Sequence, residues 1–322
     1  MKRKNSAFTV IELITVIVII SILVSLLLPG ISMVRNLAKN TQQKAQFTAL
    51  ELALEAFKND YGQYPESSIY TNTYMGAQKL AEAMVGRDRL GFHPDTDWGE
   101  GLVYTWDLYY RGVLSDFNPS GSNKRGTDET DKENFEKRKD PYIELESSNV
   151  FRLKSDTSSA DKKTGLYDVA VNPLDEDSLV LCDAYKRNKV TVYLPGAKTK
   201  MIKAGNPILY YRANLQSKTS NGPIQNRIYN AADNFTVVDV VGKIMKARKE
   251  TTEDELNDYT IYNNTLGNHT RFYELISDPK VATGSGTDAL RYWPYNSQTY
   301  ILISAGKDGL YGTEDDICNF DK

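Results

Sequence analysis

The residues best suited to chemistry in this chain of 322 residues are carboxylates gathered near its C-terminus. Asp308, Glu314, Asp315 and Asp316 lie within nine residues, and glycines interrupt the same stretch. Carboxylates held close together repel one another unless a cation neutralises them. Ca2+ binds about six to eight oxygen ligands and accepts backbone carbonyls from a bent loop. Residues 304–317 are therefore a candidate calcium loop, with a spacing unlike that of an EF-hand, and a solvated acidic turn is the alternative.

Few other groups in the sequence suit catalysis. The two histidines, His93 and His269, are far apart, which argues against a multi-histidine metal centre and a histidine-based triad. Nucleophile-elbow, phosphate-loop and zinc-protease motifs do not occur. Paired carboxylates could serve a glycosidase, but the sequence does not place two of them across a substrate. We therefore expect a protein that is not an enzyme, and a membrane-anchored enzyme or binding protein is kept as an alternative.

The charges of the chain are nearly balanced, with 39 Lys and Arg against 42 Asp and Glu and a net charge of -3. Nucleic-acid-binding domains are usually basic, so we expect no nucleic-acid partner. Thirteen of the 25 residues from 116 to 140 are charged, and 155–165 is a second polar stretch. Such segments contain too few apolar residues to fold alone. Charged, exposed loop insertions are therefore predicted at about 115–165.

The N-terminal part of the chain contains one long apolar segment. Of the 21 residues from Phe8 to Leu28, 16 are aliphatic or aromatic. As a helix this segment would be about 31 Å long, which matches the hydrocarbon thickness of a bilayer. A basic run at residues 2–4 precedes it, and such residues stay on the cytoplasmic side of a membrane. We predict a single-pass transmembrane helix over residues 8–29 with a cytoplasmic N-terminus, and an uncleaved signal anchor is the alternative.

The eight residues from Ser6 to Leu13 read SAFTVIEL. This string resembles the processing site of type IV prepilins and of the pseudopilins of type II secretion. The resemblance implies that a prepilin peptidase removes the basic leader, residues 1–7, by cleavage between Ala7 and Phe8, and that Phe8 is N-methylated. The family usually has Gly before the cut, where this chain has Ala7.

Glu12 is the only charged residue in the apolar segment. A carboxylate in a low-dielectric environment is strongly stabilised by a nearby cation. A Glu four residues after the new terminal residue is the hallmark of the family. The resemblance therefore implies that Glu12 meets the Phe8 amine of a neighbouring subunit during assembly. The alternative is a polar side chain that snorkels to the membrane interface.

Beyond Pro29 and Gly30, apolar residues recur at spacings of three and four, which predicts an amphipathic extension of the helix over residues 30–64. We expect a kink or melted turn at Pro29-Gly30 and a helix end near Gly62. The turn at 62–65 resembles the helix end of the major pseudopilin. The predicted apolar stripe, rich in alanine, comprises Ile31, Val34, Leu37, Ala38, Thr41, Ala45, Ala49, Leu52, Ala53 and Ala56.

The remainder, residues 65–322, is predicted to be a globular head. Runs of β-branched and aromatic residues at 179–182, 190–194, 208–211 and 300–303 predict short strands, and 77–84 predicts a short helix. Short strands joined by hairpins favour an antiparallel sheet, which the amphipathic helix would cover. The predicted fold is α+β, with a long N-terminal helix packed on an antiparallel β-sheet head, as in pilins.

The acidic segment itself resembles the calcium loop at the C-terminal end of major pseudopilins. The resemblance implies that Asp308, Asp315 and Asp316 are side-chain ligands of Ca2+ and that the backbone carbonyl of Ala305 is a further ligand.

These resemblances imply a structural pseudopilin of a type II secretion system. Such a chain would be anchored in the bacterial inner membrane with its head in the periplasm, and would assemble into a periplasmic filament that drives protein export across the outer membrane. The implied partners are further copies, other pseudopilins, the prepilin peptidase, the inner-membrane assembly platform and the lipid bilayer. A type IV pilin of a surface fibre for adhesion or motility is the alternative.

The two cysteines, Cys182 and Cys318, would lie outside the cytoplasm, where a disulfide can persist. A bridge between them is one prediction, and two buried thiols are the other.

Overall fold

The computed structural model describes residues 9–68, 74–96, 98, 110, 129–144, 149–154, 164–167, 178–194, 198–217, 227–247, 270–283 and 291–320. The predicted leader, the predicted cleavage site between Ala7 and Phe8, and residues 115–128 and 155–163 of the predicted insertions lie outside these ranges. The chain divides into two compact units, Met1–Gln42 and Gln43–Lys322, which are described in turn.

The long N-terminal helix α1 (Val10–Tyr61) has 52 residues and ends directly before Gly62, as predicted. It is unbroken at Pro29 and Gly30, so the melted turn expected there is absent. A proline inside a helix removes one backbone hydrogen bond, and the turns on either side keep theirs. In the first unit the described large apolar side chains are exposed, from 46% for Val24 to 75% for Val10. Within the described part of the chain, no helix is long and apolar enough to cross a membrane.

In the second unit, α1 presents large side chains to the core. Its buried positions are Gln43, Phe47, Leu50, Ala53, Leu54 and Phe57. The predicted stripe is wrong for this unit, because most of its members are exposed, namely Ala45, Ala49, Leu52 and Ala56. Burying a Leu or Phe side chain stabilises a fold by roughly 1.5–3 kcal/mol, whereas an alanine offers a single methyl group. The helix is therefore oriented by its large residues, and the alanine-rich face stays at the surface.

The strands pair antiparallel, as predicted, and among the described residues they form four small sheets. One sheet has three strands in the order β5 (Leu209–Arg212), β8 (Tyr300–Ser304) and β9 (Ile317–Cys318). The others pair β1 (Val150–Arg152) with β2 (Leu179–Leu181), β3 (Asn188–Leu194) with β4 (Lys198–Ala204), and β6 (Ser277–Thr283) with β7 (Arg291–Pro294). The four strands predicted from the sequence correspond to β2, β3, β5 and β8.

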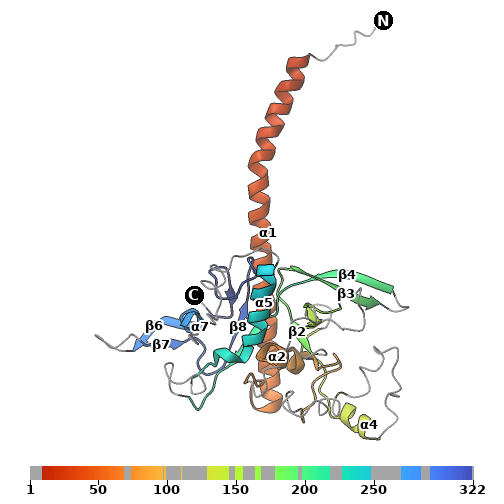
Figure 1. Ribbon diagram of the computed structural model, residues 1–322, viewed down its shortest axis with the longest axis vertical. Helices are drawn as coiled ribbons and strands as arrows, with labels where there is room; N and C mark the ends of the chain where they lie inside the picture. Colours follow the sequence, from red (N-terminus) through yellow and green to blue (C-terminus); the bar gives the residue numbers. More distant parts are fainter. Residues whose placement is uncertain are drawn as a thin grey trace. The chain divides into compact units, whose positions relative to one another are not determined.

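The pair β5–β8 lies at the centre of the head (Figure 1). Successive side chains of a strand point to opposite faces of its sheet. On one face, Tyr210 and Leu302 pack in a core with α1 and with α2 (Gly76–Val85), the helix predicted at 77–84. On the other face, Tyr211 and Ile303 pack in a second core with α5 (Phe235–Ala247) and α7 (Thr270–Ile276). The sheet is therefore covered on both faces, where the sequence predicted a single helical cover.

The charged segment near residue 130 is only partly a loop. It contains α4 (Glu129–Glu136), and Arg138 after it forms an ion pair with Asp88 in which the side chains are 4% and 0% exposed. The backbone of Lys139 also forms an isolated antiparallel β-bridge with that of Phe92. The prediction of a loop is thus wrong for residues 129–136, which form a helix, and Arg138 is held by a partner distant in sequence, but most described side chains from 133 to 140 are exposed, as predicted.

Candidate functional site

The start of α1 carries Glu12, the residue predicted to act in assembly. Its Oε2 accepts hydrogen bonds from the backbone N of Thr9 at 2.8 Å and from Thr9 Oγ1 at 2.7 Å. The backbone N of Glu12 donates to Thr9 Oγ1 at 3.4 Å, so the two residues form a reciprocal capping box. A carboxylate at this position also offsets the positive end of the helix dipole. In a single chain, Glu12 is therefore satisfied by its own helix terminus.

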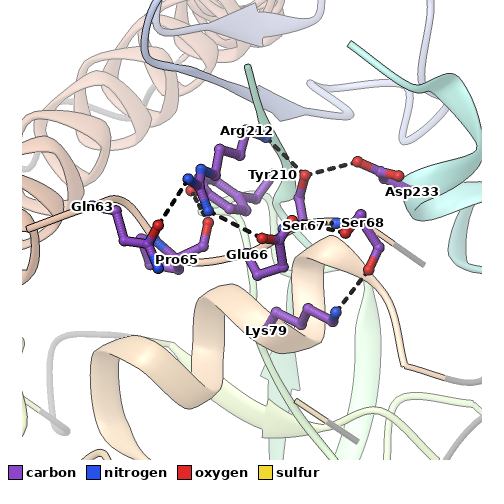
Figure 2. A network of polar contacts seen from close by, with 9 residues as sticks. All are labelled: Gln63, Pro65, Glu66, Ser67, Ser68, Lys79, Tyr210, Arg212 and Asp233. Atoms are coloured by element: carbon purple, nitrogen blue, oxygen red, sulfur yellow. Dashed lines mark hydrogen bonds and ion pairs between the residues drawn. The ribbon is translucent and has the colours of Figure 1, made fainter. Parts of the chain in front are cut away.

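The turn that follows α1 is anchored to β5 by polar side chains (Figure 2). Ser67, 2% exposed, donates from Oγ to Asp233 Oδ2 at 2.7 Å and accepts from the backbone N of Arg212 at 2.9 Å. The Tyr210 hydroxyl donates to the carbonyl of Pro65 at 2.8 Å. These contacts fix the chain where it leaves the helix and enters the head.

Glu66 occupies the centre of the same network. Its Oε1 accepts from Ser68 Oγ at 2.8 Å and its Oε2 from Arg212 Nη1 at 3.1 Å, while Lys79 Nζ donates to the carbonyl of Ser68 at 2.7 Å. Burial raises the pKa of Glu66, but the hydrogen bonds from Ser68 and the charges of Arg212 and Lys79 outweigh burial and hold that pKa below its ordinary value. The contribution of Glu66 to stability is therefore present at neutral pH and is lost as the pH falls through its folded pKa.

Removal of the Ser67 hydroxyl should weaken this junction more than removal of the neighbouring one. Ser67→Ala leaves the buried Asp233 carboxylate and the part-buried backbone N of Arg212 without this partner, so we expect it to lower the free energy of unfolding by about 2 kcal/mol. Ser68→Ala is the matched control, because its hydroxyl bonds a half-buried carboxylate, and it should cost less than about 1 kcal/mol. Urea unfolding of the full chain in detergent measures both values. Equal losses would contradict the role given to Ser67.

The acidic loop is held in shape by its own backbone amides. Asp315 Oδ2 accepts from the backbone N of Asp308 at 2.8 Å, and Asp308 Oδ1 accepts from that of Leu310 at 2.8 Å. Asp316 Oδ2 accepts from the backbone N of Gly312 at 2.7 Å. These bonds close the loop after β8 against the segment that leads into β9.

Gly306 makes this closure possible. Its φ is +58°, and a Cβ there would lie 2.2 Å from the carbonyl oxygen of Asp315. Because no side chain fits, the backbone of the first turn approaches that of the last, and the carboxyl groups of Asp308 and Asp315 come into contact. Burial first, and then the charge of Asp315, raise the pKa of Asp308 to about 6. Hydrogen bonds from Thr313 and the Asp308 backbone outweigh burial at Asp315 and lower its pKa.

The predicted ligands are only partly brought together. Asp308 and Asp315 face each other, whereas Asp316 is bonded to the backbone of Gly312. The Ala305 carbonyl accepts from the backbone N of Gly309 at 3.0 Å. Over the described ranges, no group of three or more His, Cys, Asp or Glu side chains is arranged to hold a metal ion. A cation at this loop would therefore need two carboxylates and several backbone carbonyls.

Both cysteines are thiols in the structure, so the predicted disulfide is not formed. The backbone of Cys182 forms an isolated antiparallel β-bridge with that of Pro207. Cys318 lies in β9, opposite Ile303 of β8. Burial raises the pKa of the Cys182 thiol, which keeps this group protonated and unreactive at neutral pH.

The sequence did not single out the junction residues Glu66, Ser67 and Arg212. One signal was present, since Lys79 and Glu82 are charged residues inside an otherwise apolar helical pattern, and both are 1% exposed in α2. Charged residues are rarely buried without partners, so two of them in a predicted core helix indicate a buried polar network.

A family model described as the prokaryotic N-terminal methylation motif matches residues 2–28. This match includes Ala7, Phe8 and Glu12, the residues predicted to be processed or to act in assembly. No solved structure gives a significant match.

Three curated relatives carry the name type II secretion system core protein G. The protein from Aeromonas hydrophila is 46% identical over 66 residues, which are 20% of this chain and 45% of that protein. The Pseudomonas aeruginosa protein is 33% identical over 128 residues, 35% of this chain and 86% of the relative. The Escherichia coli protein is 32% identical over 105 residues, 31% of this chain and 71% of the relative. These names favour the secretion-system interpretation over a type IV pilin. The chain belongs to the family of type II secretion system core protein G, the pseudopilins.

Proposed function

We propose that the chain is a structural subunit of a type II secretion filament, assembled through its N-terminal helix to drive protein export across the outer membrane. The observation that carries this proposal is the combination, in one chain, of the N-terminal methylation motif and a match to 86% of a core protein G. Such a subunit does mechanical work by polymerising, so we propose no catalytic activity.

The proposed anchor is the apolar segment 8–29, with the basic leader in the cytoplasm and the head in the periplasm. In support, the described apolar side chains of this segment are exposed in the structure, among them Ile11 at 73% and Leu27 at 61%. Lipid, or the helices of neighbouring subunits, would bury this surface. Proposed partners are further copies, other pseudopilins, the prepilin peptidase and the inner-membrane assembly platform.

We also propose that the acidic loop binds Ca2+. Asp308 and Asp315 would supply carboxylates, Asp316 a third after leaving Gly312, and Ala305 a backbone carbonyl. The support is the contact between two carboxyl groups in a loop closed at Gly306, where a divalent cation would relieve their repulsion. When bound, the ion would hold the end of β8 against the segment before β9.

The mature N-terminus gives the first test. We expect the mass of the chain isolated from its own membranes to show loss of Met1 to Ala7 and gain of one methyl group. Ala7 is small enough to occupy the place of the usual Gly. Intact-mass spectrometry with peptide mapping measures this, and a retained leader would contradict the proposed processing.

Deletion of the gene tests the function itself. A secretion subunit predicts that exported proteins accumulate in the periplasm while surface fibres are unchanged. Loss of surface fibres with normal export would instead support a type IV pilin. Complementation with the full chain controls for effects on neighbouring genes.

A further inference from the structure

Three consecutive residues after β2, Cys182 to Ala184, are held by α1. Gln43 Oε1 accepts a hydrogen bond from the backbone N of Ala184 at 2.8 Å, and Gln46 Nε2 donates to the Cys182 carbonyl at 3.0 Å. Gln43 is fully buried. The helix therefore binds this segment through its backbone, on both sides of Asp183.

The side chain of Asp183, 1% exposed, binds a different set of groups. Its Oδ1 accepts from the backbone N of Tyr185 at 3.0 Å and of Asn206 at 3.2 Å, and its Oδ2 accepts from Ser304 Oγ at 3.3 Å. The backbone N of Asp183 also donates to the Asn206 carbonyl at 2.8 Å. Burial raises the pKa of Asp183 to about 7, although these donors lower it. Asp183 is thus bonded to Asn206 through both its backbone and its side chain.

Asn206 continues the path to the acidic loop. Its Nδ2 donates to the carbonyl of Gly309 at 2.9 Å, and its Oδ1 accepts from Asn188 Nδ2 at 3.1 Å. The close approach depends on Gly205, because a Cβ there would lie 2.2 Å from the Asp183 carbonyl oxygen. A buried chain of hydrogen bonds therefore connects the acidic loop to the first turns of α1 in the second unit.

We propose that Asp183 and Asn206 are positioning residues that couple two features of the head. One is the conformational order of the acidic loop, and the other is the attachment of residues 182–184 to α1. The bonds that Gln43, Asp183 and Asn206 make on the path are buried, so a group that loses its partner there cannot exchange it freely for water. Loosening at either end should therefore loosen the other, because coupling between two sites is reciprocal. In the proposed filament α1 makes the axial contacts. The conformational order of the acidic loop would therefore determine how rigidly the head is attached to this helix.

The test removes the middle of the path. Asn206→Leu keeps the size of the side chain but removes its amide. In the full chain in detergent, we expect hydrogen exchange at residues 43–50 of α1 to rise about 3- to 10-fold, with exchange in α2 unchanged. The matched control is Asn319→Ala, which removes an acceptor for the backbone N of Leu302 at 2.8 Å on the same sheet. An equal rise at 43–50 in both variants, or no rise in Asn206→Leu, overturns the proposal.

A second variant tests the coupling from the α1 end of the path. It also serves as the test if Asn206→Leu does not fold. Gln43→Ala removes the acceptor for Ala184, and exchange of the loop amides at 305–312 should rise by a similar factor. Unchanged exchange in the loop overturns the coupling.

A further experiment uses calcium and rests on the proposed calcium site. Adding EDTA to the wild-type chain saturated with Ca2+ should raise exchange at 43–50, and Asn206→Leu should remove this response. If calorimetry detects no bound Ca2+, the calcium proposal fails, and the metal-free comparison above still decides the coupling. A response that persists in Asn206→Leu overturns the path.

Discussion

Replacing Glu12 with alanine is expected to abolish assembly of the chain into filaments while the head remains folded. If Glu12 pairs with the Phe8 amine of a neighbour in a water-poor environment, removing one partner leaves an uncompensated charge and costs about 3–5 kcal/mol. That corresponds to a loss of more than about 100-fold in association. Loss of the capping contact to Thr9 is smaller, about 0.5–2 kcal/mol. Cross-linked polymer in membranes of the complemented deletion strain measures assembly.

Two control variants separate the charge from the cap. Thr9→Val removes the hydroxyl that bonds Glu12 but keeps the carboxylate, so assembly should persist. Glu12→Gln keeps an acceptor for Thr9 but not the charge, so assembly should fail. Each variant needs a mature N-terminus confirmed by mass, since uncleaved chains would fail for another reason. Normal polymer from Glu12→Gln would show that the charge is not used.

The elements of this fold were predictable where local signals agree. Gly62 ends α1, and β-branched and aromatic runs form β2, β3, β5 and β8 because such residues pack well on a pleated surface. The buried face of α1 was not predictable from spacing alone. Two stripes fit a helical period, one of alanines and one with Phe47, Leu50 and Leu54. The tertiary packing selects the second because its side chains remove more apolar area from water.

The candidate functional residues also differ in how far the sequence could predict them. Glu12 and the acidic loop could be found because their residues are adjacent in the sequence, and Asp308 and Asp315 do come into contact. The network around Glu66 and Arg212 joins residues 146 positions apart, so the charged residues in α2 indicate that a buried network exists but no local pattern identifies these two partners. Arg138 is the opposite case, because it lies in a charged run that the sequence predicted to be solvated. Its side chain is buried in an ion pair with Asp88, a residue distant in the sequence.

Removal of calcium should lower the melting temperature of the head. Free Ca2+ at about 100 times its dissociation constant stabilises a protein by about 2.7 kcal/mol. For a unit of this size we expect a fall of roughly 5–10 °C when EDTA is added. Calorimetry of the full chain in detergent, with Mg2+ as a control cation, measures the shift. An unchanged melting temperature together with no heat of Ca2+ binding would remove the site.

Substitutions in the loop distinguish a calcium site from a solvated acidic turn by the sign of their effect. Asp308→Asn removes a like charge beside Asp315, so without metal it should raise the melting temperature. With Ca2+ the same change removes a ligand and should lower it relative to the wild-type chain. Glu314→Gln is the matched control, because Glu314 is exposed and is not a predicted ligand, so it should keep the full calcium response. If Asp308→Asn is stabilising in both conditions, the carboxylates form a turn that binds no metal, because only a bound cation makes the charge of Asp308 favourable.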